Sequence, residues 1–167
     1  MVSAQDRVRA AAEREKDEAI AFLRALIAAG REGEAAVQAL VAAKAASLGC
    51  RVDQQTNTPT GVPMVKEIAG EGANAHGQRT SLVARRHGSR DGRSLVFFAH
   101  PDSEPVAGVE HWTRDPFAGI VEGGRLHGWG VADDLAGVAA MVQGLAVLAA
   151  AGLKPRGDVV LASTPSK

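Results

Sequence analysis

Apolar positions recur at helical spacing in three parts of the chain. Ile20, Leu23 and Ile27 form such a stripe before Gly30, a residue suited to ending a helix. Helices are expected over residues 4–29, 32–48 and 135–151. Two helices are therefore expected to precede any β-sheet.

Short apolar or alternating runs predict the strands. They are expected over residues 51–56, 62–68, 81–85, 95–99 and 158–162, with a hairpin over 119–126, turns at 57–61 and 90–92, and a loop over 70–78. The run Leu95–Ala99 is apolar without alternation, which is typical of a central strand covered on both faces. The succession of strands and helices predicts a layered α/β fold in one domain spanning 1–167.

The charge balance restricts the kind of ligand. Lys plus Arg and Asp plus Glu are 19 each, so no long-range field favours nucleic acid or an anionic membrane. A small, locally recognised ligand is expected. No apolar stretch is expected to approach the roughly 20 residues that span a bilayer, which predicts a soluble, cytoplasmic protein without a membrane partner.

The single cysteine, Cys50, excludes an internal disulfide and suits a reducing compartment. It is expected in the core, just after a helix.

His100 and Asp102 follow the apolar run 95–99 directly. Ligands of α/β sheets bind beyond the carboxyl ends of strands, where these residues are expected. A neutral imidazole is a standard zinc ligand, and a carboxylate two residues away can orient its ring. The alternative is that both residues merely cap the end of the strand.

Two further carboxylates, Asp133 and Asp134, follow the turn 128–130 and precede a long helix. Either could bind a metal, and either could instead cap the helix, which is the usual role of Asp in this setting.

The remaining histidines and the loop aromatics are expected to be structural or exposed. His76 and His87 are expected at the surface, and His127 is expected to pack within the hairpin. His111 and Trp112 could border a substrate entrance, but Trp112 and Phe117 are expected to anchor a long loop to the core.

The order of these features resembles a known family. An apolar strand, His-Pro-Asp, the segment 111–120, the hairpin and a Gly-X-Gly-X-X-Asp turn opening a helix are similar to the dinuclear zinc hydrolases. That family includes aminoacylase, acetylornithine deacetylase, succinyl-diaminopimelate desuccinylase and carboxypeptidase G. The likeness is most specific over 95–137, and the segments 21–27, 80–85 and 157–162 support it.

The resemblance implies an αβα sandwich of the zinc-exopeptidase type, present here as the N-terminal part of the catalytic domain without its lid. It makes His100 a terminal ligand of one zinc, Asp102 the residue that orients His100, and Asp133 the carboxylate that bridges two zinc ions. Asp134 would be a neighbour of the site rather than a ligand.

The resemblance also implies an activity. Two metal ions, zinc with cobalt or manganese as alternatives, would activate a water that hydrolyses an amide bond in an N-acyl amino acid or small peptide. The full-length protein would be a possible homodimer, since the family dimerises through its lid domain.

Several positions depart from the family pattern. Trp129 and Leu135 stand where the family has Arg and Lys, and Ser166-Lys167 falls on its Glu-Glu pair of general base and zinc ligand. We therefore expect a truncated chain that is inactive alone, with apolar surface exposed near 158–162 and a tendency to self-associate. The alternative is a non-catalytic relative that acts as a binding or assembly module.

Overall fold

The structure is a computed structural model that describes residues 2–58, 78–89, 91–104 and 106–165. Its helices are α1 (Ala4–Arg14), α2 (Lys16–Ala29), α3 (Glu34–Ser47) and α5 (Ala136–Ala150), with short helical turns η1 (Gly30–Glu32), η3 (Val109–His111) and η4 (Val131–Leu135). Its strands are β1 (Arg51–Asn57), β2 (Arg79–Arg86), β3 (Leu95–Ala99), β4 (Ile120–Glu122), β5 (Arg125–His127) and β6 (Val159–Ser163). The expected strand 62–68, most of the loop 70–78 and Ser166-Lys167 lie outside the described residues.

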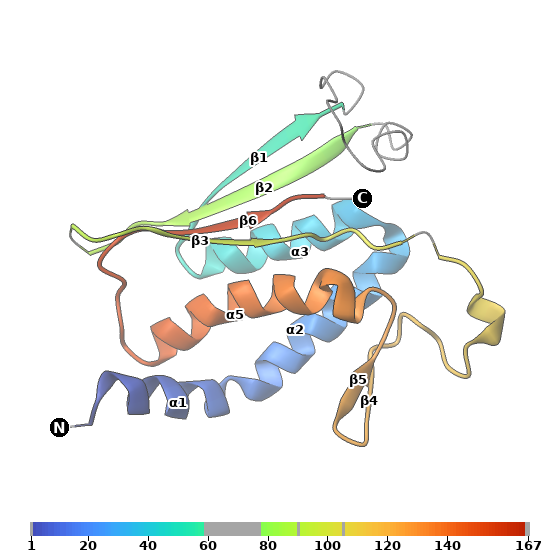
Figure 1. Cartoon of the computed structure of the whole chain (residues 1–167), viewed down its shortest axis with the longest axis horizontal. Helices are drawn as coiled ribbons and strands as arrows, with labels where there is room; N and C mark the ends of the chain where they lie inside the picture. The colour runs from blue at the N-terminus through green and yellow to red at the C-terminus, as the bar shows by residue number, and fades with distance from the viewer. Residues whose placement is uncertain (1, 59–77, 90, 105, 166–167) are drawn as a thin grey trace.

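The mixed α/β class is confirmed. One four-stranded sheet has the order β1-β2-β6-β3, and in the described part of the chain all four helices lie on one side of it (Figure 1). The hairpin β4–β5, which turns at Gly123-Gly124 as expected, stands apart from the sheet.

The strand order corrects the expected hairpin turn at 90–92. β2 and β3 do not pair, because β6 lies between them, antiparallel to β2 and parallel to β3. Leu82, Ser163 and Ala99 are register partners across the three strands. The carboxyl ends of β3 and β6 therefore lie at the same edge of the sheet as the start of β2.

The expectation that residues 95–99 form a central strand covered on both faces is wrong for the described residues. Among the described residues β3 pairs with β6 alone and is an outermost strand of the sheet. The side chains of Leu95, Val96, Phe97 and Phe98 are 46–68% exposed. An unalternating apolar run shows that a strand is suited to burial, and the elements packed around it decide whether it is buried. The expected apolar surface beside 158–162 is thus present on β3.

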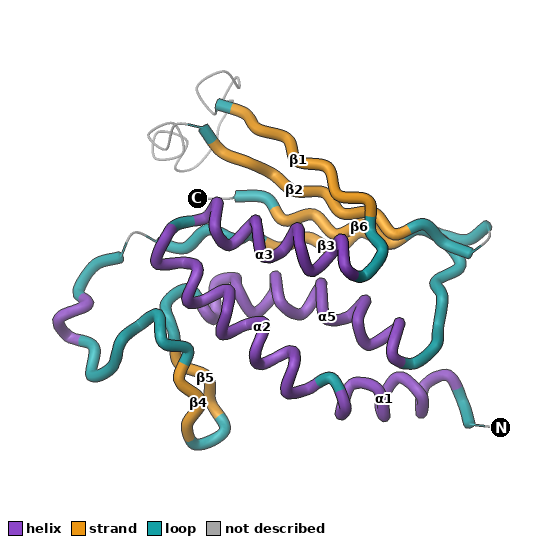
Figure 2. The backbone as a smooth tube through the Cα atoms, turned by 180° about the vertical axis from the view of Figure 1, so that it is seen from behind, coloured by secondary structure: helices purple, strands orange, loops and turns teal. Residues whose placement is uncertain are grey.

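Helix α5 lies in the middle of the helical layer, where α1, α2 and α3 all pack against it (Figure 2). Its buried residues include Val138, Val142 and Leu145, which join Leu26 and Leu161 in one core cluster. The segment Val131–Ala150 is long and apolar enough to cross a membrane, contrary to the expectation that no segment approaches that length. Its central position in the helical layer accounts for this composition, since a helix packed on several sides is apolar on several faces.

The helix expected over 4–29 is divided at Glu15 into α1 and α2. α1 buries only Ala11 among its eleven residues, whereas α2 buries Phe22, Leu26 and Ile27. Helix α1 thus lacks an apolar stripe like the one through which α2 packs on the core. The two helices run in different directions, and both pack against α5 (Figure 2).

Two buried glutamines differ in how many of their amide atoms have hydrogen-bond partners: Gln38 uses its Nε2, while its Oε1 has no partner among the described residues. Gln38 of α3 donates through Nε2 to the carbonyl oxygens of Thr80 (3.0 Å) and Ser163 (2.8 Å), and so ties the helix to two neighbouring strands. Gln143 of α5 is 5% exposed, and its amide atoms have no hydrogen-bond partner among the described residues. Cys50 is a free, buried thiol as expected, and burial raises its pKa.

Replacing Gln38 by Met should lower the free energy of unfolding by about 1–3 kcal/mol, because two carbonyl oxygens lose their donor. The same replacement at Gln143 should be neutral or stabilising, because it removes buried polar atoms that lack partners. Urea denaturation of both variants gives the comparison. Equal losses in the two variants would contradict this account.

Asp158, just before β6, links the start of that strand to the end of β2. The backbone N–H of Gly88 donates to Asp158 Oδ1 (2.9 Å) and lowers the pKa of this carboxyl, with smaller effects from His87 and Arg85 and an opposing one from burial. A carboxyl with a lowered pKa in the folded state stabilises the fold above its unfolded pKa and loses this effect as pH falls.

The Asp158→Asn variant should therefore melt below the wild-type temperature near neutral pH, and the difference should shrink as pH drops below about 4. Thermal unfolding followed by circular dichroism across this range measures the effect. Asp53→Asn, at an exposed ion pair with Arg51, is the control. A Tm difference for Asp158→Asn that is constant over the whole pH range would contradict the assignment.

Candidate functional site

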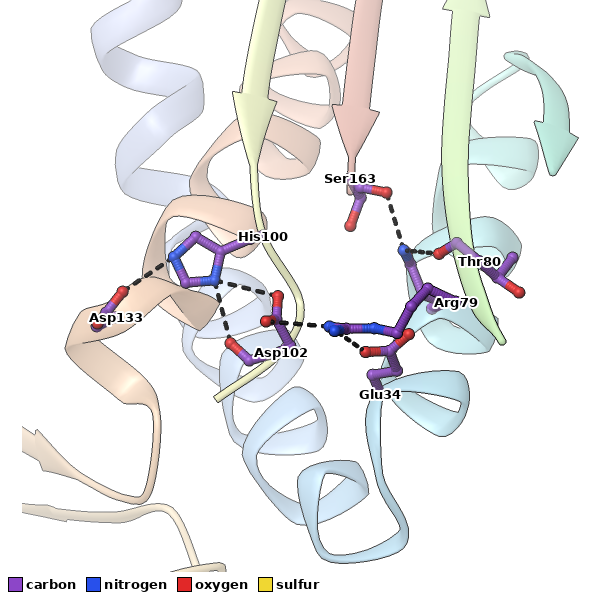
Figure 3. A network of polar contacts seen from close by, with 8 residues as sticks. Glu34, Arg79, Thr80, His100, Asp102, Asp133 and Ser163 are labelled. Carbon is purple, nitrogen blue, oxygen red and sulfur yellow. Dashed lines mark hydrogen bonds and ion pairs between the residues drawn. The ribbon is translucent and has the colours of Figure 1, made fainter. Parts of the chain in front are cut away.

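His100 lies directly after β3, at the edge of the sheet where β3 and β6 end (Figure 3). Its side chain is 14% exposed. The Nδ1 atom is 3.1 Å from the carbonyl oxygen of Asp102 and 3.4 Å from Asp102 Oδ1. The imidazole ring is thus held through Nδ1 by the residue that the sequence predicts as its orienting partner.

Asp133 approaches His100 from the opposite side. Its Oδ1 atom lies 2.9 Å from His100 Nε2, and its side chain is 63% exposed. Asp133 and Asp134 have non-helical backbone angles within η4, and a cis peptide bond joins them. Helix α5 begins after them with Leu135 at its N-cap position and no side-chain capping bond. The helix-cap alternative is therefore not what the structure shows.

The two glycines before η4 explain how this turn reaches His100. Gly130 has φ +68°, and a Cβ atom there would lie 2.9 Å from Ser103 Cβ, in the segment that follows His100. A Cβ at Gly128 would lie 2.8 Å from the side chain of Ile27 in α2. The Gly-X-Gly spacing thus permits close packing of the Asp133 turn against both neighbours.

A buried ion cluster lies behind His100, and the sequence did not predict it. Arg79, the first residue of β2, places Nη2 2.8 Å from Glu34 Oε2 and 3.2 Å from Asp102 Oδ2 (Figure 3). The side chains of Arg79 and Asp102 are 10% and 7% exposed. Arg79 lies two residues before the strand expected over 81–85, and nothing in the spacing pointed to Arg79 or to Glu34.

The other predicted residues do not join the site through any contact described. His87 is exposed as expected, whereas His127 is exposed on the hairpin, so its expected packing role is wrong. His76 lies outside the described residues. Phe117 is partly buried beneath the guanidinium of Arg31 (5.0 Å) and so anchors its loop. Trp112 remains 39% exposed and contacts Trp129, with ring centroids 5.7 Å apart.

The donor chemistry at His100 and Asp133 suits part of a metal site. An imidazole nitrogen and a carboxylate oxygen are both zinc ligands, and here they converge from two different elements. Within the described ranges, no group of three or more His, Cys, Asp or Glu side chains is gathered closely enough to hold an ion. The described residues therefore fit two donors of a metal site.

The Gly130→Ala variant should unfold at lower denaturant concentration, with a loss of about 1–2 kcal/mol, because Ala disfavours positive φ and its methyl group would crowd Ser103. Gly123→Ala is the matched control: its φ is +57°, with nothing within 4 Å of the added Cβ. Urea denaturation should show the larger loss for Gly130→Ala. An equal loss would mean that close packing against Ser103 contributes nothing.

Comparison with known proteins places this geometry in a family. Residues 96–166 match the model of Peptidase family M20/M25/M40. Succinyl-diaminopimelate desuccinylase of Methylibium petroleiphilum is 41% identical over 86 residues, which are 51% of this chain and 22% of that protein. The Leptothrix cholodnii protein of the same name is 33% identical over 131 residues, covering 78% of this chain and 30% of its own.

Comparison with solved structures shows a similar fold. The crystal structure of human carnosine dipeptidase 1 superposes with a TM-score of 0.75 at 16% identity, over 97% of this chain and 34% of that one. The chain thus spans about a third or less of the length of these relatives. The resemblance expected from His100-Pro-Asp and the Asp133 turn is confirmed, and residues 96–166 belong to Peptidase family M20/M25/M40.

Proposed function

We propose that this chain carries two ligands of a metal-dependent amide hydrolase site. His100 would bind one metal ion through Nε2, and Asp133 would bridge that ion and a second one. The observation that carries the proposal is the approach of His100 Nε2 to Asp133 Oδ1 at 2.9 Å, while Nδ1 is held from behind by Asp102. A histidine oriented through one ring nitrogen presents the other as a ligand.

Each residue has a distinct part in this proposal. Asp102 offers two acceptors to Nδ1 of His100, its carbonyl oxygen at 3.1 Å and Oδ1 at 3.4 Å. With the proton on Nδ1, Nε2 would be the nitrogen that binds a metal ion held between it and Asp133. Asp133 offers a carboxylate on the exposed side of the site, where a substrate can approach from solvent. Metal ions held here would polarise a carbonyl group and lower the pKa of a bound water.

The substrate class follows from the relatives' names. Two are called succinyl-diaminopimelate desuccinylase and one carnosine dipeptidase, so an amide bond is the common target. We extend this class to the present chain as the amide bond of an N-acyl amino acid or small peptide. Zinc suits one imidazole and one carboxylate, with cobalt or manganese as alternatives. We propose a cytoplasmic location, with which a chain that has one cysteine and so no internal disulfide is compatible.

The proposed ligands predict a metal affinity that mutation should remove. Zinc binding measured by calorimetry should weaken at least about tenfold in both His100→Ala and Asp133→Asn, because each loses a direct donor. Cobalt should give a visible absorption band that the same variants lose. His111→Ala removes an exposed histidine and is the control.

Zinc binding that is absent from the unmodified chain, or equal in all four proteins, would contradict the metal site in this chain. Hydrolysis of N-succinyl and dipeptide substrates by the zinc-loaded chain tests the activity separately. Zinc binding without any hydrolysis would support the two metal ligands but not an activity of this chain by itself.

A further inference from the structure

The Asp102 carboxylate divides its two oxygen atoms between two partners. Oδ1 lies 3.4 Å from His100 Nδ1, and Oδ2 lies 3.2 Å from Arg79 Nη2 (Figure 3). A carboxylate held at one oxygen can still rotate about its χ2 torsion, whereas contacts at both oxygens restrict that rotation. The contact with Arg79 therefore bears on where Oδ1 points.

Arg79 is itself held in place by a second carboxylate. Its Nη2 atom is 2.8 Å from Glu34 Oε2, in the first turn of α3. The guanidinium lies between the two acids and is nearly buried, so water screens these contacts little. The row Glu34, Arg79, Asp102 thus joins a helix, the start of β2 and the loop after β3.

From this arrangement we propose that Arg79, anchored by Glu34, is a positioning residue for His100. It fixes the Asp102 carboxylate so that Oδ1, 3.4 Å from Nδ1, joins the Asp102 carbonyl oxygen, at 3.1 Å, as an acceptor for the Nδ1–H of His100. This leaves Nε2 as the metal-binding nitrogen. The part of this inference that assigns metal binding to Nε2 rests on the proposed function. The orientation of the ring through Asp102 can be tested without any metal.

The ring tautomer gives that test. The Asp133→Ala change removes the carboxylate that lies 2.9 Å from Nε2, so the proton of neutral His100 should reside mainly on Nδ1, toward Asp102. Arg79→Met in this background should shift the Nδ1–H to Nε2–H ratio at least about twofold toward Nε2–H, because Oδ1 is no longer held as an acceptor and only the Asp102 carbonyl oxygen remains for Nδ1–H. Long-range ¹H–¹⁵N NMR, at a pH where the imidazole is neutral, measures this ratio.

Two further variants separate positioning from general disruption. Arg79→Met alone leaves both Glu34 and Asp102 without their shared cation, whereas Glu34→Gln/Arg79→Met leaves only Asp102 without it and should destabilise the fold less. The double variant in the Asp133→Ala background should show the same tautomer shift. Arg85→Met, on the same strand with a half-exposed side chain, is the matched control and should leave the ratio unchanged.

A ratio unchanged in the folded double variant, or shifted equally by Arg85→Met, overturns the proposal. With Asp133 present, Glu34→Gln/Arg79→Met should also weaken zinc binding by about tenfold, as loss of a group that orients a ligand does. If the unmodified chain binds no zinc, the metal site is wrong, while the tautomer ratio still decides whether Arg79 orients His100. If zinc binds and the ratio does not shift, the positioning role alone is wrong.

Discussion

The insertion of β6 between β2 and β3 is the constraint on which the rest of the structure depends. β6 runs parallel to β3 and antiparallel to β2, so two strand ends and one strand start meet at one edge of the sheet. His100 leaves β3 at this edge, and Arg79 enters β2 there. Gln38 of α3 donates to carbonyl oxygens on both β2 and β6, which ties the helical layer to the same edge.

Helix α5 brings the remaining part of the site to this edge. It packs in the middle of the helical layer, and the turn before it carries Asp133 toward His100. Gly130 permits that approach because a side chain there would crowd Ser103. The site is therefore assembled from a loop after a strand and a turn before a helix, two kinds of segment that a packed core can hold rigidly.

Much of the local structure could be predicted from the sequence. The extents of α3, α5, β3 and the β4–β5 hairpin follow the predicted ranges closely, because periodicity and glycine turns are local signals. The pairing of neighbours could not be predicted. The expected hairpin turn at 90–92, the central place of β3 and the packing of His127 were wrong, since each depends on which element lies alongside.

The sequence by itself determined the fold class, the family likeness and the residue types at His100, Asp102 and Asp133, because these depend on short runs of adjacent residues. Tertiary structure alone decided that Arg79 and Glu34 stand behind Asp102, since 45 residues separate these two along the chain and the order of the strands brings them together. A buried cation needs carboxylate partners, and the fold selects which carboxylates come within reach.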